Sequence, residues 1–158
     1  NKKMKKTIVI LSLAIIGFSA CKKKDSGSAT TCTKTDTLQN GQWKLASVTN
    51  PLIGDLTTSM KSCQKDNLYT FNADKTITVD EGGEKCNSAD MQTRVDGSWN
   101  LTSDYKQISI SSSIFASLGI TTLTGDVVQI NSTTMEVKKD TTVSGFPTTI
   151  NIKFTNVK

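Results

Sequence analysis

Four cysteines, Cys21, Cys32, Cys63 and Cys86, are the most reactive side chains of a 158-residue sequence that contains no histidine. Histidine is the side chain that most often acts as a general base and as a metal ligand. Its absence excludes a Ser-His-Asp triad, and no serine lies within a Gly-x-Ser-x-Gly turn. The cysteines also lack the Cys-x-x-Cys spacing of a metal site. The sequence therefore predicts no catalytic residue, no metal site and no cofactor, and it favours binding over enzymatic activity.

Acidic residues gather in one short segment, at Asp80, Glu81, Glu84 and Asp90. Their order does not follow the alternating oxygen ligands of an EF-hand calcium loop. Two carboxylates could also perform acid and base work on a sugar, but any two loop acids would serve equally well. A run of charges between strands is usually solvated. We therefore expect a solvent-exposed hairpin here, without a bound calcium ion.

The net charge of +5 is unevenly distributed along the chain. Residues 1–34 contain eight of the 19 basic residues and one of the 14 acidic residues, which leaves 11 basic and 13 acidic residues from residue 35 onward, a net charge of −2. A nucleic-acid interface needs a basic patch on the folded domain. We therefore expect no nucleic-acid partner.

Residues 1–20 have the layout of a secretory signal peptide. Lysines precede an apolar run of about eleven residues that ends at Phe18, whereas a transmembrane helix needs roughly 20. The sequence Phe18-Ser19-Ala20-Cys21 resembles the lipobox of bacterial lipoproteins, with phenylalanine in place of the usual leucine. The resemblance implies that Cys21 is lipidated. The alternative is a secreted protein that is cut near Ala20 and keeps a free thiol.

Residues 21–35 are expected to form a flexible tether, because no aliphatic side chain larger than alanine occurs between Cys21 and Leu38. Such a segment cannot bury enough apolar surface to offset the entropy lost on ordering. A bacterial lipoprotein carries three acyl chains, and two or more hold a protein stably on a membrane. We therefore expect a lipid anchor at Cys21 on the bacterial outer membrane, with the domain facing the periplasm or the cell surface.

From Gly41 onward, apolar residues recur in pairs two positions apart, which is the spacing of a strand that buries one face. Turn residues separate the pairs. Eight such segments predict eight antiparallel strands joined up and down, with little helix. The segments are Trp43/Leu45, Tyr69/Phe71, Ile77/Val79, Trp99/Leu101, Ile108/Ile110, Val128/Ile130, Met135/Val137 and Ile150/Ile152/Phe154.

Eight short strands leave exposed sheet edges, and closure into a barrel removes them. We expect an all-β, eight-stranded antiparallel up-and-down barrel over residues 36–158. Its interior is either filled by side chains or just wide enough for one small ligand. The best helical candidate, Ser113 to Leu118, is interrupted at Gly119. Lys44 is expected to face outward, because its two neighbours in the first strand face inward.

Two tryptophan segments carry a resemblance to a known family. Gly41-Gln-Trp43 looks like the lipocalin signature, in which the tryptophan closes one end of the barrel. Cys63, Cys86 and a second Gly-x-Trp sequence at Trp99 then follow in an order similar to the lipocalin-like domain of bacterial lipoproteins. The resemblance implies a lipocalin-like barrel.

This resemblance covers roughly residues 36–157 and has two departures from a full-length lipocalin. The chain lacks a clear C-terminal helix, and it lacks the arginine that packs on the signature tryptophan. Its one arginine, Arg94, lies in the middle of the domain. Lipid transport is therefore not implied by the family resemblance.

The resemblance also implies a disulfide between Cys63 and Cys86, which flank the expected strand pair 68–80. Closing a loop of this size contributes about 3 kcal/mol in the chain-entropy account. If Cys21 is lipidated, Cys32 is the remaining cysteine. It is then either a free or incidentally oxidised thiol, or one half of an intermolecular bridge.

Two non-enzymatic functions are expected from such a barrel. The first is binding of a small apolar or amphipathic molecule at the open end, where the inward-facing aromatic residues Tyr69, Phe71, Trp99 and Phe154 lie nearest. The alternative is a filled barrel that acts as an envelope interaction protein or inhibitor, using its loops to contact a protein or glycan partner. Those loops are 50–62, 80–92 and 140–149.

Overall fold

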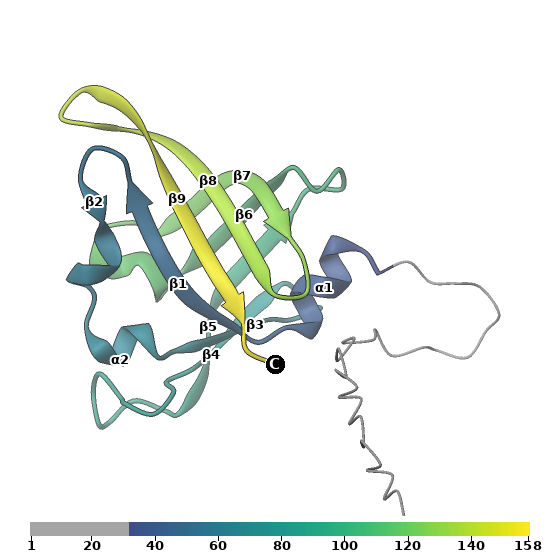
Figure 1. Ribbon diagram of the computed structural model, residues 1–158. Helices are drawn as coiled ribbons and strands as arrows, with labels where there is room; N and C mark the ends of the chain where they lie inside the picture. The colour runs from purple at the N-terminus through teal and green to yellow at the C-terminus, as the bar shows by residue number, and fades with distance from the viewer. Residues whose placement is uncertain (1–31) are drawn as a thin grey trace, which may run out of the picture.

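A computed structural model describes residues 32–158, which form a closed barrel of antiparallel strands with short helices at its ends and flank (Figure 1). The expected signal peptide and Cys21 lie outside the described residues. A two-residue strand, β2 (Gly54–Asp55), lies beside the end of β1. The eight strands of the wall are β1 (Trp43–Asn50), β3 (Leu68–Phe71), β4 (Thr76–Asp80), β5 (Thr93–Leu101), β6 (Gln107–Ser112), β7 (Thr122–Ile130), β8 (Thr134–Val143) and β9 (Phe146–Asn156).

The wall strands pair in chain order, and β9 returns to β1 to close the barrel. Across this seam Leu45 pairs with Phe154, and Val48 pairs with Ile152. All of these pairings are antiparallel. The predicted eight-stranded antiparallel up-and-down barrel is therefore confirmed.

One end of the barrel is closed by helix α1 (Lys34–Asn40), which the sequence did not predict. Thr33 and Asp36 form a capping box, since the Asp36 N–H donates to the Thr33 hydroxyl at 3.1 Å and the Thr33 N–H donates to the Asp36 carboxylate at 2.9 Å. The side chain of Leu38 is buried and packs the helix against the core. The first two residues of α1, 34–35, belong to the segment expected to be a tether.

The remaining helical segments are four to six residues long. The 3-10 helix η2 (Ser113–Leu118) begins at a cap by the Ser112 side chain and ends at Gly119, whose left-handed backbone (φ 72°) suits glycine. The interruption predicted at Gly119 is therefore confirmed. Among residues 32–158, no helix is long and apolar enough to span a membrane.

The interior of the barrel is filled by side chains. Trp43, Phe71, Phe115 and Phe154 are each at most 1% exposed. Phe154 packs edge-to-face against Phe115 at 6.2 Å and against Tyr69 at 6.3 Å between ring centroids. Side chains with essentially no accessible surface leave no room for a water molecule beside them. Of the two interiors expected for an eight-stranded barrel, this chain has the filled one.

Strand β7 departs from the predicted alternation of inner and outer faces. The register between β7 and β8 shifts between Val127 and Gln129, so Val128 is the extra residue of a β-bulge. Val128 is 54% exposed, whereas Ile130 is buried. The prediction that Val128 and Ile130 share the inner face is therefore wrong for Val128, because the bulge turns its side chain outward.

The wall is incomplete between β1 and β3. These strands pair only over the first two residues of β1, and β2 pairs with the last two. Residues 45–48 therefore have a strand partner on one side only, which is β9. The segment that carries η1 (Leu56–Ser59) and α2 (Ser62–Lys65) lies along this stretch of β1 (Figure 1).

Candidate functional site

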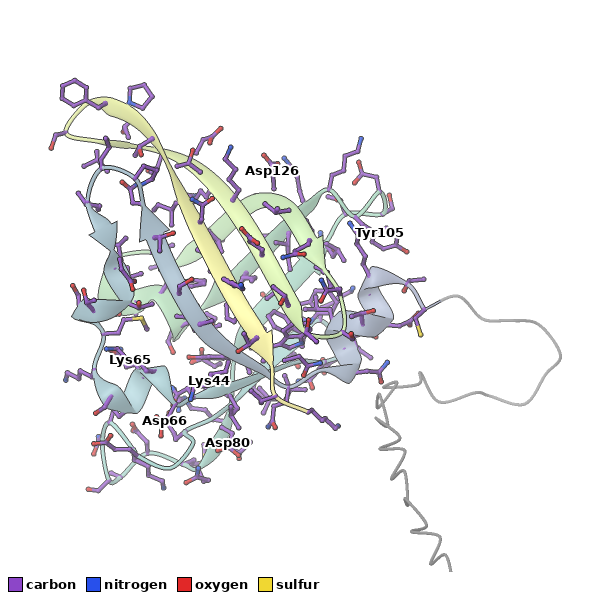
Figure 2. All side chains as sticks on the ribbon, in the orientation of Figure 1. Lys44, Lys65, Asp66, Asp80, Tyr105 and Asp126 are labelled. Carbon is purple, nitrogen blue, oxygen red and sulfur yellow. A yellow bond between two sulfur atoms is a disulfide. The ribbon has the colours of Figure 1, made fainter. Side chains whose placement is uncertain are left out.

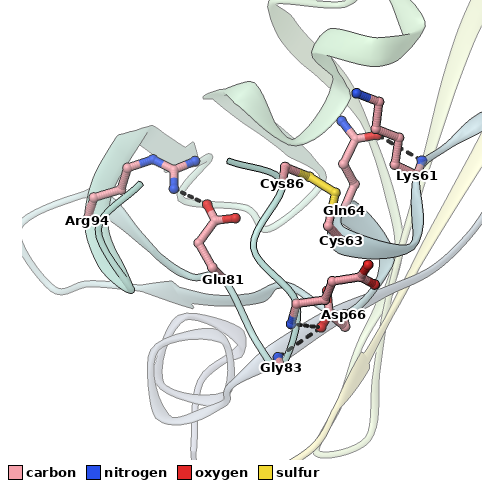
Figure 3. Close-up of a disulfide and its surroundings, with 9 residues drawn as sticks. Lys61, Cys63, Gln64, Asp66, Glu81, Gly83, Cys86 and Arg94 are labelled. Atoms are coloured by element: carbon pink, nitrogen blue, oxygen red, sulfur yellow. Dashed lines mark hydrogen bonds and ion pairs between the residues drawn. A yellow bond between two sulfur atoms is a disulfide. The ribbon is translucent and has the colours of Figure 1, made fainter. Parts of the chain in front are cut away.

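A disulfide ties α2 to the loop between β4 and β5 (Figure 3), and both lie at the end of the barrel away from α1 (Figure 1). Cys63 and Cys86 are 23 residues apart in the sequence, and their Cα atoms are 5.1 Å apart. Cys63 is buried in α2, and Cys86 is exposed on the loop. The predicted pairing is confirmed. Cys32 is also disulfide-bonded, so the interpretation of Cys32 as a free thiol does not hold.

Two aspartates hold the turns of this loop. Asp66 follows α2, and one of its carboxylate oxygens accepts hydrogen bonds from the N–H groups of Gly83 and Glu84, both at 2.8 Å. Asp80 accepts from the N–H of Gly82 at 2.9 Å. These carboxylates therefore cap turns. Across the described chain, no group of three or more acidic or cysteine side chains is arranged to hold a metal ion.

Glu81 is buried, although it belongs to the acidic run that was expected to be solvated. It is 2% exposed and forms an ion pair with Arg94 of β5. Asp96 of the same strand lies 3.6 Å from a guanidinium nitrogen of Arg94. The hydrogen bond with Glu81 raises the pKa of Arg94 above its ordinary value. The expectation of a solvated hairpin is wrong for Glu81, because the cation that neutralises it comes from the next strand.

We refer to Glu81, Arg94 and Asp96 as the mouth cluster. Asp96 also accepts from the N–H and the hydroxyl of Ser113, at 2.9 and 2.7 Å, which ties the cluster to the start of η2. Burial raises the pKa of Tyr69 to about 12, and the carboxylates of Asp96 and Glu81 add to the rise. A hollow beside them, which we refer to as the mouth hollow, has a volume of about 170 Å³. This is smaller than the few hundred Å³ of most small-molecule sites.

The four aromatic residues predicted as ligand contacts belong to the packed core. Tyr69, Phe71, Trp99 and Phe154 are 2%, 0%, 2% and 0% exposed. Phe71 packs edge-to-face on Trp99 at 5.8 Å, and the Trp99 indole N–H donates to the Asn72 carbonyl at 3.0 Å. Tyr69 borders the mouth hollow. Ligand contact by these residues stays a prediction, and in this structure they pack against one another.

A larger hollow lies on the outer flank of the barrel, where β1 lacks a second strand partner. Its volume is about 510 Å³, which is within the range of ligand sites. We refer to it as the wall groove. Its lining residues are Lys44, Leu45 and Ala46 of β1, Asp55 of β2, Thr57 and Thr58 of η1, Met60, Lys65 of α2, and Thr155 of β9.

The sequence indicated only one feature of the wall groove, the outward orientation of Lys44, which is confirmed. The other lining residues were missed as a site. Residues 51–65 contain no strand-spaced apolar pair and no motif, so the sequence has no signal that they fold back against β1. A groove formed in this way depends on tertiary packing.

The signature residues close the end of the barrel that α1 covers. Trp43 is fully buried, and its indole N–H donates to the carbonyl oxygen of Leu38 in α1 at 2.9 Å. Gly41 lies against the same indole ring. Arg94 lies at the opposite end of the barrel, so it is not a partner of Trp43.

Comparisons with known proteins agree with this architecture. The family model described as a lipocalin-like domain matches residues 40–141, which is well over half of the chain. No curated protein matches the sequence. Lipocalin-like domains are in general binding folds without enzymatic activity. With this match and its closed eight-stranded barrel, the chain belongs to the lipocalin-like domain family.

Proposed function

We propose that this chain is a non-enzymatic binding protein of the bacterial envelope that takes a small apolar or amphipathic molecule. The observation that supports binding is the wall groove, a hollow of about 510 Å³ on the flank of a lipocalin-like barrel. Small-molecule sites are concave and mostly apolar, with a few polar groups that orient the ligand. Because side chains fill the interior, we expect the ligand to bind on the flank of the barrel.

Ligand binding is tested on the chain from residue 22 to residue 158, exported behind a cleavable signal so that the disulfide forms. We call this the soluble form. It is titrated with fatty acids, porphyrins and flavins while tryptophan emission and melting temperature are recorded. A ligand present at 100 times its Kd stabilises the native state by about 2.7 kcal/mol. No change with any of the three classes would contradict the proposal.

The proposal includes a lipid anchor at Cys21 on the outer membrane. It is supported by the lipobox-like sequence before Cys21 and by the lysines before the apolar run. Mass spectrometry should find an acylated N-terminal peptide that begins at Cys21, and Cys21→Ser should leave the membrane fraction. Cys32→Ser is the matched control and should remain there. An unmodified Cys21 would contradict the anchor, as would membrane retention of Cys21→Ser.

Exposed apolar side chains favour a second function, contact with a protein or glycan partner in the envelope. Leu52, Ile53 and Phe146 are 56%, 53% and 67% exposed, in two hairpins at the mouth end of the barrel. The hairpins are joined, since the Asn50 amide donates to the Thr149 carbonyl at 3.1 Å. Cross-linking in intact envelopes should capture a partner that Leu52→Ser/Phe146→Ser loses. Capture that is identical with both chains would contradict this function.

A further inference from the structure

We propose that the wall groove binds an amphipathic molecule with one anionic head group, with the head between Lys44 and Lys65 and the apolar part against Leu45 and Met60. This inference rests on the proposed function, because it assigns a site and a ligand class to that binding activity. The site lies on the outer flank and not in the barrel interior, which side chains already fill.

The groove owes its shape to an irregularity in β1. The register between β1 and β9 shifts between Leu45 and Ser47, so Ala46 is an extra residue in the strand. Ala46 is exposed and borders the groove. Its side chain is one methyl group, which leaves the groove open above the strand. β-Bulges are over-represented next to functional sites, where they redirect side chains.

Lys44 and Lys65 supply positive charge from two different elements. Lys44 is half-buried on β1, and Lys65 is exposed at the end of α2, on the same flank of the barrel (Figure 2). Within residues 32–158, neither ammonium lies within ion-pair distance of a carboxylate, because the ion pairs there involve Arg94 and Lys106. Both ammonium groups are therefore available to a ligand.

Asp55 is the acidic residue of the lining, and its carboxylate caps the turn that follows it. Its Oδ1 atom accepts from the hydroxyl of Thr57 and from the Thr57 N–H at 2.9 Å. These hydrogen bonds lower the pKa of Asp55, and Lys65 makes a smaller contribution in the same direction. The lining thus carries two positive charges and one negative charge, which favours an anionic ligand.

The floor of the groove is apolar. Leu45 and Met60 are 6% and 4% exposed, so each belongs to the core and presents a small apolar area to the groove. Methionine is unbranched and adapts to irregular contacts. The rim adds the hydroxyl-bearing residues Thr58 and Thr155. An apolar floor beneath a positively charged rim matches an amphiphile with an anionic head.

The ligand class is tested with three probes of equal chain length, decanoate, decanol and decyltrimethylammonium. Each is titrated into the soluble form by calorimetry, below its micelle concentration. Decanoate should bind at least about tenfold more tightly than the other two, since a hydrogen bond to a charged group contributes about 1.5 kcal/mol or more. Equal affinities, or preference for the cation, would overturn the inference.

The two lysines are tested by charge reversal. Lys44→Glu/Lys65→Glu should weaken decanoate binding at least about tenfold, because it replaces attraction of the head group by repulsion. Lys106→Glu/Lys138→Glu is the matched control, since it changes the net charge equally on exposed residues outside the groove. Equal affinity of both double variants for decanoate would overturn the inference. Melting curves check that both variants are folded.

Ala46 allows a test in which the sign of the effect is predicted. Ala46→Lys should strengthen decanoate binding and Ala46→Asp should weaken it, because both add a charged side chain beside the groove without disturbing the core. Amide chemical shifts locate the bound probe. Shifts concentrated at Lys44, Ala46 and Thr58 support the groove, whereas shifts concentrated at Phe71 and neighbouring core residues would overturn it.

Failure of this inference and failure of the proposed function give different results. Binding of decanol or decyltrimethylammonium that Lys44→Glu/Lys65→Glu does not affect would overturn the anionic class and leave a binding protein. Absence of binding by every probe, with fatty acids, porphyrins and flavins included, would overturn both.

Discussion

Gly41 lies so close to Trp43 that a Cβ atom added to the glycine would sit 2.5 Å from the indole Nε1 atom. Its backbone has an ordinary φ of −89°, so glycine is required here for space and not for conformation. The same Nε1–H donates to the carbonyl of Leu38. The Gly-x-Trp signature is thus a packing unit in which the absent side chain makes room for the ring that closes the barrel.

Gly41→Ala should lower the free energy of unfolding by about 1 to 3 kcal/mol, the usual cost of overpacking a core. The methyl group would push the Trp43 indole away from Leu38 and weaken its hydrogen bond. Urea denaturation of the soluble form measures the loss. Gly83→Ala is the matched control, because its Cβ would meet Asp66 at an ordinary 3.6 Å. Equal stability of the two variants would contradict the packing role of Gly41.

Removing the disulfide should destabilise the domain. Cys63→Ala/Cys86→Ala should lower the free energy of unfolding by about 2 to 4 kcal/mol, because the unfolded chain regains the freedom of a closed loop. Exchange of the Gly83 and Glu84 amide protons should also speed up, since their acceptor Asp66 follows α2. Reductant should destabilise the wild-type chain more than the variant, because only the wild-type chain contains the Cys63–Cys86 bond. A variant as stable as the oxidised wild type would contradict this prediction.

The strands were predictable because their signal is local. Alternating apolar residues, such as Ile77 and Val79, carry the period of a half-buried strand wherever they occur, and Gly41 and Trp43 mark the first strand. The bulge at Val128 was not predictable from the sequence. Val127 and Val128 are adjacent, so either valine can face the core, depending on the register of the strand. Only the pairing of β7 with β8 decides which face Val128 takes.

Helix α1 and the buried Glu81 were missed for different reasons. The capping box at Thr33 and Asp36 is visible in the sequence, but Leu38 is the only large aliphatic residue of that helix, so no helical period follows the cap. Glu81 sits in an acidic run that looks solvated. Its burial depends on the ion pair with Arg94, which lies on the next strand, β5. The wall groove likewise depends on contacts between distant segments.

The ion pair of the mouth cluster allows a prediction, because a buried charge that loses its partner destabilises the native state. Arg94→Met should lower the free energy of unfolding by about 2 to 4 kcal/mol, because it leaves the carboxylate of Glu81 buried and unpaired. Glu81→Leu/Arg94→Met removes both charges and should recover most of the loss. Urea denaturation of the single and double variants measures the difference. A double variant no more stable than Arg94→Met would show that the charge of Glu81 is not the cause.

Tyr69 should make the domain sensitive to alkaline pH. The free phenol has a pKa of 10.0, and burial in the native state raises the pKa of Tyr69 to about 12. Between these values the unfolded chain loses a proton that the native chain retains, so stability is full below pH 10 and falls as pH rises to 12. The loss amounts to about 2 to 3 kcal/mol at the upper end.

Tyr69→Phe cannot ionise, so urea denaturation across this pH range should show a smaller loss of stability for this variant than for the wild-type chain. Lysine deprotonation also contributes in this range, but it is common to both chains and cancels in the comparison. Tyr105→Phe, at the other tyrosine, is the matched control and should retain the wild-type decline. If Tyr69→Phe loses stability as steeply as Tyr105→Phe, the buried hydroxyl of Tyr69 is not the group that senses alkaline pH.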